Sequence, residues 1–503
     1  MNVAHLLDLH AKRRPDAPAV IGSGGPLSWR ELRARVTRLA AGLRARGVGR
    51  GARVAVLAHN DARYFETYLA LAWLGALVVP LNTRLAAAEL AFQLSDARVT
   101  LWLVGDALTA LADATAPALQ RLAPGDENLR VAEPVNDFAP VEADDALGIF
   151  YTGGTTGLPK GVVLTHGNLL VNAQNVAPAV GFTPDDVYLH AAPMFHLADL
   201  GYLWALMLAG GAHAFLPAYS PDAFCEAVSR QRVTAALLAP SMVTTLVRSD
   251  AVRAHDLRSW TRLMYGGSPI SEETLRRAME RLPCRLYQGY GQTEATHTVC
   301  MMTPEQHEAA LERPGLLRSC GKPTAGVEVR VVADGDLNPV KPGESGEIVL
   351  RGPTVMKGYW NRPAETAEAL AGGWLHTGDI ASVDAEGFVY ILDRKKDMII
   401  TGGENVYSVE VENALASHPA VADVAVFGVP DDRWGESVHA VVVLASGRSA
   451  TPEELAAHCR KSIGGYKVPK TFEFSGALLR TPAGKIQKAA LREPRWRGAA
   501  RRV

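Results

Sequence analysis

The sequence lacks the cysteine patterns of a disulfide-stabilised or zinc-binding protein. Its five cysteines are odd in number and widely spaced, with no Cys-x-x-Cys pair and no cluster with histidine. This argues against a disulfide framework and a structural zinc site. The N-terminus also lacks a signal-peptide core, because Asp8 interrupts its only apolar stretch. These features predict a cytoplasmic protein.

The sequence also lacks an excess of charge of one sign. It has 52 Lys and Arg residues and 53 Asp and Glu residues, which gives a net charge of −1. Without a global basic field, overall charge cannot hold nucleic acid or an anionic membrane, so ligands must bind at local sites. With 48% hydrophobic residues the chain is neither disordered nor fibrous. Its 503 residues suggest about three domain-sized units or one large two-lobed enzyme.

One stretch, residues 200–219, carries no formal charge and is long enough to span a bilayer. Gly210, Gly211 and Pro217 divide it, and no basic residue anchors its ends. A buried helix at about 199–209 followed by a strand at about 212–216 is the simpler interpretation. We therefore expect no integral membrane segment.

Strands and helices alternate before about residue 320, with short apolar strands at 53–57, 78–81 and 99–104 and a helix at 64–74. Such alternation predicts parallel sheets covered by helices. After residue 320, short strands and Gly-rich turns predict a small β-rich subdomain.

The five charged residues at 393–397 separate two stretches that each look able to fold. A solvated turn is the ordinary interpretation of such a run, and an interdomain hinge is the sharper one. The predicted fold is therefore α/β. A large N-terminal domain of stacked αβ sheet subdomains plus the β-rich subdomain covers residues 1–395, and a small mobile α+β domain covers residues 396–503.

A Gly- and Thr-rich loop, Tyr151 to Gly161, directly follows an apolar strand at 147–150. Glycines let backbone N–H groups approach phosphate oxygens, hydroxyls add donors, and Lys160 adds a positive charge. It is not a Walker loop, which needs Gly-Lys-Ser/Thr, because Pro159 precedes the lysine. A flexible turn without function is a poor alternative for such a composition.

Together with five further segments, this loop resembles the signature of the adenylate-forming enzymes, the superfamily of acyl-CoA synthetases, luciferases and peptide-synthetase adenylation domains. The resemblance extends from about residue 10 to about residue 490, with the motifs in the order of the family. They are Tyr151-Thr-Gly-Gly-Thr-Thr-Gly-Leu-Pro-Lys-Gly161, Tyr290-Gly-Gln-Thr-Glu294, Trp374-Leu-His-Thr-Gly-Asp379, Asp393-Arg394-Lys395-Lys396-Asp397, Gly402-Gly403-Glu404-Asn405-Val406 and Pro482-Ala-Gly-Lys485-Ile486.

The resemblance implies a two-step reaction in which ATP and a carboxylic acid give an acyl-adenylate and pyrophosphate, and the thiol of CoA then displaces AMP. Because a carboxylate attacking the α-phosphate brings two anions together, the site must neutralise charge. By resemblance, Lys485 bridges carboxylate and phosphate, and Thr293 bonds the α-phosphate. Glu294 and Thr155 hold Mg²⁺.

The same resemblance implies that Asp379 binds the ribose hydroxyls, that Arg394 reaches the nucleotide, and that Tyr290 offers a face to adenine, opposite residues 266–269. The full set implied to bind ATP or CoA is Thr152, Gly153, Gly154, Thr155, Thr156, Lys160, Gly266, Gly267, Ser268, Gln288, Gly289, Tyr290, Gly291, Asp379, Ile391, Arg394, Gly402 and Gly403.

For the second step, the resemblance implies that the C-terminal domain turns about Lys396, so that Lys485 leaves and a thiol can approach. Gly402 and Gly403 would then lie beside the pantetheine channel, where a side chain would obstruct it. Relatives often have Pro after the tyrosine of this loop, whereas Ser408 follows Tyr407 here, which we expect to loosen the loop.

The acyl pocket is expected to include His196, Leu200, Trp204, Gly267, Thr296 and His297. It is mostly apolar and has no Arg or Lys to meet a second carboxylate, which disfavours diacids. A medium- or long-chain fatty acid is the expected substrate. The alternatives are a hydroxycinnamate or other aromatic acid, or the loading of a separate carrier protein. Because no carrier domain follows the last motif, CoA is the expected thiol. A homo-oligomer is left open.

Other functional classes fit less well. Taken alone, Asp379 suits a turn, Lys485 a solvated surface, and His196 a buried structural role. A catalytically silent binding protein of this fold would lack Lys485, Glu294 or Asp379, yet all are present. A phosphotransferase would need the Gly-Lys-Ser/Thr loop that is absent.

Overall fold

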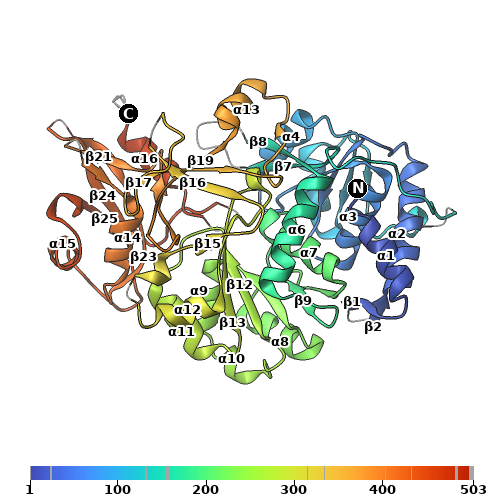
Figure 1. The fold of residues 1–503 in the computed structure, drawn as a ribbon, viewed down its shortest axis with the longest axis horizontal. Coiled ribbons are helices and arrows are strands. Elements are labelled where there is room, and N and C mark those ends of the chain that lie inside the picture. The colour runs from blue at the N-terminus through green and yellow to red at the C-terminus, as the bar shows by residue number, and fades with distance from the viewer. Residues whose placement is uncertain are drawn as a thin grey trace.

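Two large sheets covered by helices are built mainly from the part of the chain before residue 324, as the alternating pattern predicts (Figure 1). The computed structural model describes residues 2–22, 25–130, 133–152, 159–313, 315–333, 335–402, 404–431, 433–481 and 485–497. Neighbouring central strands run parallel in both sheets, which requires helical crossovers between them. The α/β fold class is therefore confirmed.

The first sheet has seven strands in the order β18-β8-β7-β4-β3-β5-β6. The strands are β18 (Gly358–Tyr359), β8 (Lys160–Thr165), β7 (Ala146–Thr152), β4 (Leu77–Pro80), β3 (Arg53–Leu57), β5 (Leu101–Val104) and β6 (Arg121–Leu122). Its helices are α2 (Trp29–Arg44), α3 (Ala62–Leu74), α4 (Ala87–Asp96) and α5 (Thr109–Thr115). Helix α2 begins with a capping box, because Ser28 accepts from the backbone of Glu31 and the Glu31 carboxylate accepts from that of Ser28.

The second sheet has nine strands in the order β15-β14-β13-β12-β11-β9-β10-β1-β2. The strands are β15 (Lys322–Pro323), β14 (Cys300–Met302), β13 (Arg285–Tyr290), β12 (Arg262–Gly266), β11 (Ala235–Leu238), β9 (Val187–His190), β10 (Ala212–Phe215), β1 (Pro18–Gly22) and β2 (Gly25–Ser28). Its helices are α1 (His5–Arg13), α6 (His166–Val180), α7 (Leu197–Ala209), α8 (Pro221–Gln231), α9 (Pro240–Arg248), α10 (Ala251–Ala254), α11 (Glu272–Arg281) and α12 (Pro304–Ala310).

Helix α7 explains why residues 200–219 are so apolar. One side of it, with Leu203 and Trp204, packs into the core shared with α2 and α3, and the other side, with Leu206, packs on the nine-stranded sheet. A helix buried on both sides is hydrophobic all round. The predicted helix and strand are confirmed as α7 and β10, and no helix of the described residues combines the length and apolarity needed to cross a membrane.

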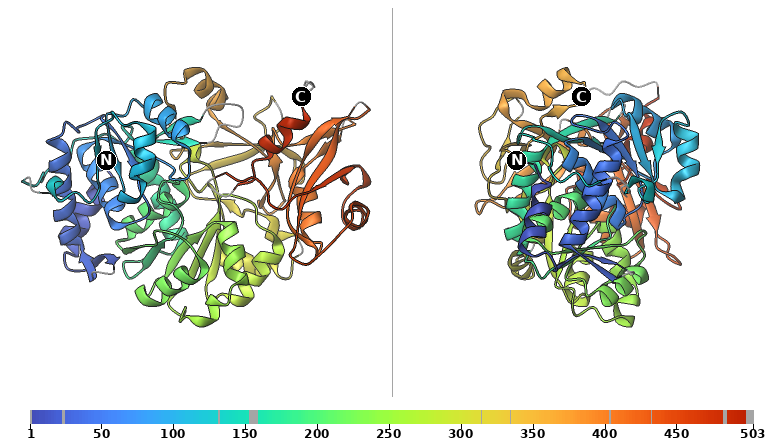
Figure 2. Two further views of the ribbon diagram at one scale, coloured as in Figure 1. Left: turned by 180° about the vertical axis from the view of Figure 1, so that it is seen from behind. Right: turned by 90° about the vertical axis from the view of Figure 1, so that its right-hand side faces the viewer.

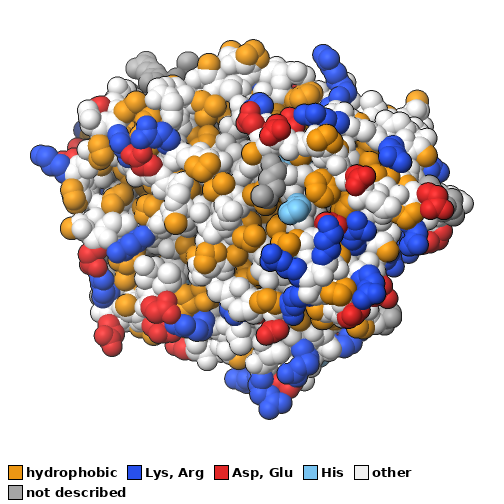
Figure 3. Space-filling view, turned by 45° about the vertical axis from the view of Figure 1, so that its right-hand side comes forward, with side chains coloured by type: hydrophobic (Ala, Val, Ile, Leu, Met, Phe, Trp, Pro, Cys, Tyr) orange, Lys and Arg blue, Asp and Glu red, His pale blue; other side chains and the backbone are white. Residues whose placement is uncertain are grey.

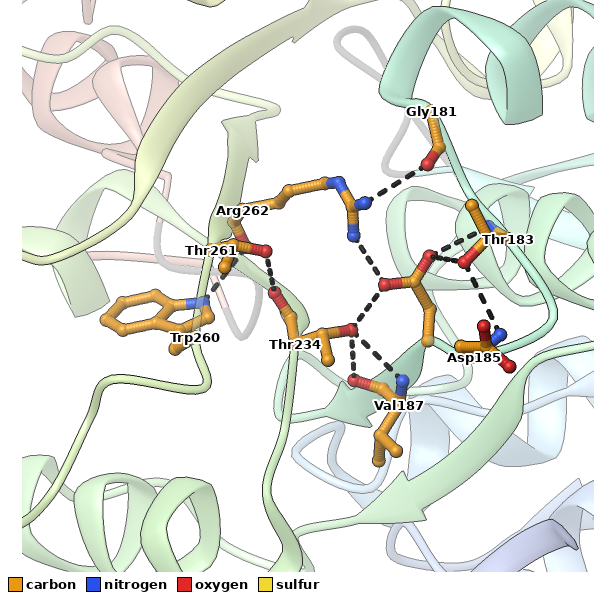
Figure 4. A network of polar contacts seen from close by, with 9 residues as sticks. Gly181, Thr183, Asp185, Val187, Thr234, Trp260, Thr261 and Arg262 are labelled. Carbon is orange, nitrogen blue, oxygen red and sulfur yellow. Dashed lines mark hydrogen bonds and ion pairs between the residues drawn. The ribbon is translucent and has the colours of Figure 1, made fainter.

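A buried carboxylate ties together three strands of the nine-stranded sheet (Figure 4). Asp186, just before β9, accepts from the hydroxyl of Thr234 at 2.7 Å, pairs with Arg262 at 2.5 Å and accepts from the backbone of Thr183 at 2.7 Å. Burial alone would raise the pKa of this carboxyl, but the hydrogen bonds and the guanidinium lower it. The starts of β9, β11 and β12 are thus held in register.

A smaller antiparallel sheet follows, in the order β16-β17-β19-β20, as predicted for the region after residue 320. Its elements are β16 (Glu328–Val332), β17 (Ser345–Arg351), β19 (Leu375–Val383), β20 (Val389–Arg394) and the adjoining helix α13 (Pro363–Ala369). Seen from the front and from behind, this sheet lies between the large sheets and the C-terminal unit (Figures 1 and 2).

The C-terminal unit is α+β and has a hydrophobic core of its own. Its elements are β21 (Ile399–Thr401), β22 (Glu404–Val406), α14 (Ser408–Ala416), β23 (Val421–Asp431), β24 (Gly435–Leu444), α15 (Pro452–Cys459), β25 (Thr471–Phe474) and α16 (Lys488–Arg492). The boundary between residues 395 and 396 stays a prediction. All five cysteines are buried free thiols. On the face in Figure 3, basic and acidic side chains are interspersed, in keeping with the net charge of −1.

One side chain joins the two large sheets. Asn60, which follows β3 and is buried, donates to the carbonyls of His190 at 2.8 Å and Ala192 at 2.7 Å. Its amide oxygen accepts from the backbone of Met194 at 2.8 Å. These three bonds hold the segment that leads from β9 to α7, and His196 lies at the end of that segment.

We expect Asn60→Ala to lower the free energy of unfolding by about 2 to 4 kcal/mol, because buried backbone groups lose their partner. Urea denaturation measures this. Asn128→Ala is the control, since Asn128 is exposed and its side chain bonds the nearby Asp126. Equal stability of the two variants would contradict the role assigned to Asn60.

Candidate active site

The predicted nucleotide site is organised around the carboxylate of Asp379. Its Oδ2 accepts from the hydroxyl of Tyr290 at 2.7 Å, and its Oδ1 pairs with Nε of Arg394 at 2.5 Å. Asp379 on β19 lies opposite Arg394 on β20, while Tyr290 ends β13 of the nine-stranded sheet. The structure thus brings together three residues that belong to three different motifs, far apart in the sequence.

The charges of this group are fixed by their surroundings. The neighbouring Asp379 carboxylate raises the pKa of Arg394, so the guanidinium stays cationic. Burial and the same carboxylate raise the pKa of Tyr290, so the phenol keeps its proton and remains a donor. Each oxygen of Asp379, which is only 3% exposed, keeps a further lone pair beyond the bond described. The carboxylate is therefore held in place and can still accept from a diol.

Glu294 lies in a short turn, Thr293–Ala295, just beyond β13. Its Oε1 accepts from the hydroxyl of Tyr359 at 3.1 Å, and Nζ of Lys160 lies 5.0 Å from the centre of the Tyr359 ring. The lysine of the Gly-rich loop and the predicted metal ligand are thus neighbours. Tyr359 was not predicted, because a single tyrosine on β18 has no motif around it.

The donor set around Glu294 fits a hard cation that shares its ligands with phosphates. Among the described residues no group of three or more His, Cys, Asp or Glu side chains could enclose a metal ion. Mg²⁺ is commonly held by one or two carboxylates plus substrate phosphates rather than by a protein cage. Glu294 supplies such a carboxylate.

Lys485 of the last motif reaches the same site from the C-terminal unit. Burial lowers its pKa, and its ammonium also interacts with the charges of Arg394, Asp379 and Glu294. More than a third of its surface is still accessible. This places a cation beside the predicted nucleotide site.

The backbone between β13 and β14 is strained at the predicted acyl pocket. Thr296 and His297 both have positive φ, 64° and 119°, a costly conformation for residues other than glycine. A Cβ on Gly291 would lie 1.3 Å from the carbonyl oxygen of His297, so only glycine fits there. The hydroxyl of Thr296 donates to the carbonyl of Thr354 at 2.5 Å and helps to hold this shape.

Two histidines of the predicted acyl pocket, His196 and His297, are buried close to each other in neutral form. Burial lowers the pKa of His196 to about 4, helped by the nearby Lys485, and burial lowers that of His297 to about 3, helped by His196. Nδ1 of His196 accepts from the backbone of Ala198 at 3.1 Å. The proton of this neutral ring is therefore on Nε2, which is a donor.

The other predicted site residues are distributed as follows. Leu200 and Trp204 are buried in the core, and Ile391 packs against it from β20. The ends of β12 and β13 lie so close together that a Cβ on Gly266 would be 2.2 Å from the carbonyl oxygen of Gly289. Six more residues of the predicted set belong to the part of the chain that the structure describes: Thr152, Gly267, Ser268, Gln288, Lys396 and Gly402. Five lie outside it: Gly153, Gly154, Thr155, Thr156 and Gly403.

We expect Tyr290→Phe to weaken ATP binding roughly tenfold, because the Asp379 carboxylate loses one of the two groups that orient it. Isothermal titration with ATP measures this. Tyr390→Phe is the matched control, as it removes another tyrosine-to-aspartate bond, from Tyr390 on β20 to Asp384 just after β19, at 3.1 Å. Unchanged affinity in Tyr290→Phe would remove Asp379 from the ribose site.

Comparisons with known proteins agree with this geometry. The model of the AMP-binding enzyme family matches residues 7–360, and that of the AMP-binding enzyme C-terminal domain matches residues 410–485. A feruloyl-CoA synthase of an Amycolatopsis species is 43% identical over 484 residues, 96% of each chain. A fatty acid–[acyl-carrier-protein] ligase of Streptomyces coeruleorubidus is 35% identical, over 98% of this chain and 96% of the relative.

Among solved structures, o-succinylbenzoate CoA synthetase of Bacillus subtilis in complex with its acyl-adenylate intermediate is similar over 97% of both chains. Its TM-score is 0.88 and its sequence identity 32%. Both the sequence and the fold therefore lead to one family. The chain belongs to the AMP-binding, adenylate-forming enzymes and is an AMP-forming acid–thiol ligase.

Proposed function

We propose that the chain is an ATP-dependent CoA ligase for an aromatic, feruloyl-type acid, which it activates as the acyl-adenylate. The observation that carries the ligase chemistry is the convergence of Lys485 with Arg394, Asp379 and Glu294 at one site. The preference for an aromatic acid rests first on the relative at 43% identity, a feruloyl-CoA synthase. This aromatic proposal replaces the expectation of a fatty acid, which rested on the apolar pocket. The comparisons give no specific support to a role in fatty-acid metabolism.

Polar atoms in the pocket wall support an acid that carries a hydroxyl group. The ring of His297 stands edge-on to Tyr202, with centroids 4.6 Å apart. The hydroxyls of Tyr202 and Thr298 both lie 3.1 Å from the point that a Cβ on Gly289 would occupy. The Tyr202 hydroxyl is buried beside that of Thr298. A phenolic substrate that reaches these hydroxyls can bond to them, whereas an alkyl chain offers them no partner.

In the proposed first step the substrate carboxylate attacks the α-phosphate of ATP and pyrophosphate leaves. Lys485 and Arg394 supply positive charge where the two anions meet. Glu294 would hold Mg²⁺, whose chemistry is to neutralise phosphate charge. Asp379 orients the ribose, and the neutral His196 lies beside the carbonyl without adding a charge to the apolar pocket.

Pyrophosphate release over a panel of acids tests the proposal. The panel holds ferulate, 4-coumarate, cinnamate, o-succinylbenzoate and saturated acids from C4 to C16, each with and without CoA. We expect the highest kcat/KM with ferulate or 4-coumarate, and a lower value with cinnamate, which lacks the phenol. Greater turnover with saturated acids would reject the aromatic proposal and leave the ligase chemistry in place.

The thiol acceptor is tested in the same assay. The relative at 35% identity loads an acyl carrier protein, so a phosphopantetheinylated carrier protein is offered in place of CoA. We expect CoA to be preferred. Faster transfer to the carrier protein would assign the chain to carrier loading instead.

We expect Lys485→Ala to slow acyl-adenylate formation by about 10² to 10³, because a charge that stabilises the transition state is lost. Transfer from pre-formed acyl-adenylate to CoA should be nearly unaffected, since the lysine acts only in the first step. Lys461→Ala, an exposed lysine of the same unit, is the control. Equal losses in both half-reactions would contradict this division of roles.

A further inference from the structure

A buried hydrogen bond connects the segment before the predicted hinge with the segment after it. Asp393, the last but one residue of β20, is 3% exposed, and its Oδ2 accepts from the backbone N–H of Ser408 at 2.5 Å. Ser408 is fully buried and is the first residue of α14 in the C-terminal unit. Lys396 lies between the two residues in sequence.

The side chain of Ser408 continues this contact towards Lys485. Its Oγ accepts from Nζ of Lys488 at 2.5 Å, and Lys488 also pairs with Glu412 at 2.7 Å. Lys488 begins α16, three residues after Lys485. The backbone carbonyl of Lys396 itself accepts from Arg492 of the same helix at 3.2 Å. Helix α16, which follows Lys485, is therefore hydrogen-bonded both to Ser408 and to the backbone of Lys396.

The bond between Asp393 and Ser408 joins residues on opposite sides of the predicted hinge. Rotation about the backbone bonds of Lys396 moves everything after it, including Ser408, relative to Asp393. In the arrangement described here Lys485 lies among Arg394, Asp379 and Glu294. The bond therefore accompanies the arrangement in which the first half-reaction takes place.

We propose that Ser408 is a positioning residue that holds the C-terminal unit in the adenylate-forming arrangement, by bonding Asp393 through its N–H and Lys488 through its hydroxyl. This inference rests on the proposed two-step function. The sequence-based expectation that Ser408 loosens its loop is wrong, because the residue is buried and bonded through both groups. A proline at this position could make neither bond.

Ser408→Pro removes the hinge-crossing bond together with the bond to Lys488, at a position whose backbone suits proline. Position 408 is the first of α14, where proline is favoured because its N–H is not needed by the helix. Tyr407 has φ −83° and ψ 119°, the extended conformation that a residue before proline requires. Ser408→Ala is the complementary variant, because it keeps the N–H and removes only the hydroxyl.

Ala87→Pro is the matched control. Ala87 is the first residue of α4, its predecessor is extended with φ −70° and ψ 156°, and its N–H has no acceptor in the described part of the chain. Both half-reactions are measured for each variant, as single-turnover acyl-adenylate formation and as transfer from supplied acyl-adenylate to CoA. Melting temperature is recorded beside them.

We expect Ser408→Pro to lower the ratio of adenylation to thiolation rates at least about tenfold, because both charge-assisted hydrogen bonds of Ser408 are lost. Ser408→Ala should shift it about threefold in the same direction, and Ala87→Pro should leave it unchanged. An unchanged ratio in Ser408→Pro, or equal losses in both steps, overturns the proposal. If Ser408→Pro does not fold, an unchanged ratio in Ser408→Ala overturns it.

Limited trypsin digestion separates this proposal from the proposed function. Arg394, Lys395 and Lys396 offer cleavage sites at the hinge, and loss of the bond should speed cutting there severalfold in Ser408→Pro but not in Ala87→Pro. This readout needs no substrate. A protein inactive with every acid would reject the function, while unchanged cleavage would reject the role of Ser408.

Discussion

The carboxylate of Asp379 is the point where separately folded parts of the chain meet. It belongs to the small antiparallel sheet, it binds Tyr290 of the nine-stranded sheet, and it binds Arg394 at the end of β20. Through Arg394 it also shares an electrostatic site with Lys485 of the C-terminal unit. A buried carboxylate is costly unless it is paired and hydrogen-bonded. If one of these parts were misplaced, the Asp379 carboxylate would lose a partner. Folding of the chain and assembly of the site are therefore coupled.

The predicted acyl side of the site differs from the nucleotide side, because its ionisable side chains are uncharged. His196 and His297 are both neutral because burial lowers their pKa. Helix α7 is apolar on both faces because it separates two hydrophobic cores. The cations of the site are gathered on the nucleotide side. An apolar wall that contains the hydroxyls of Tyr202 and Thr298 suits a ligand with an aromatic body and a polar end.

Most of the fold could be predicted from local pattern, and the residues that could not are those defined by long-range contacts. Alternating strands and helices, the capping box at Ser28 and the buried nature of residues 199–216 all depend on near neighbours in sequence. Motifs in the order of the family located Asp379 and Arg394. Tyr359 and Asn60 belong to no motif, and their partners are distant in sequence. Ser408 was misjudged because the partner of a backbone N–H cannot be seen in a sequence.

The geometry at Ser408 also bears on how such enzymes diverge. Most serine codons differ from a proline codon by a single base. The first position of α14 accepts either residue without strain, since Tyr407 is already extended and the helix does not use that N–H. One point mutation can therefore add or delete a bond across the hinge while every residue around the nucleotide stays the same. If the C-terminal unit turns at Lys396 as proposed, the rate of that movement can then change without any change in what the enzyme binds.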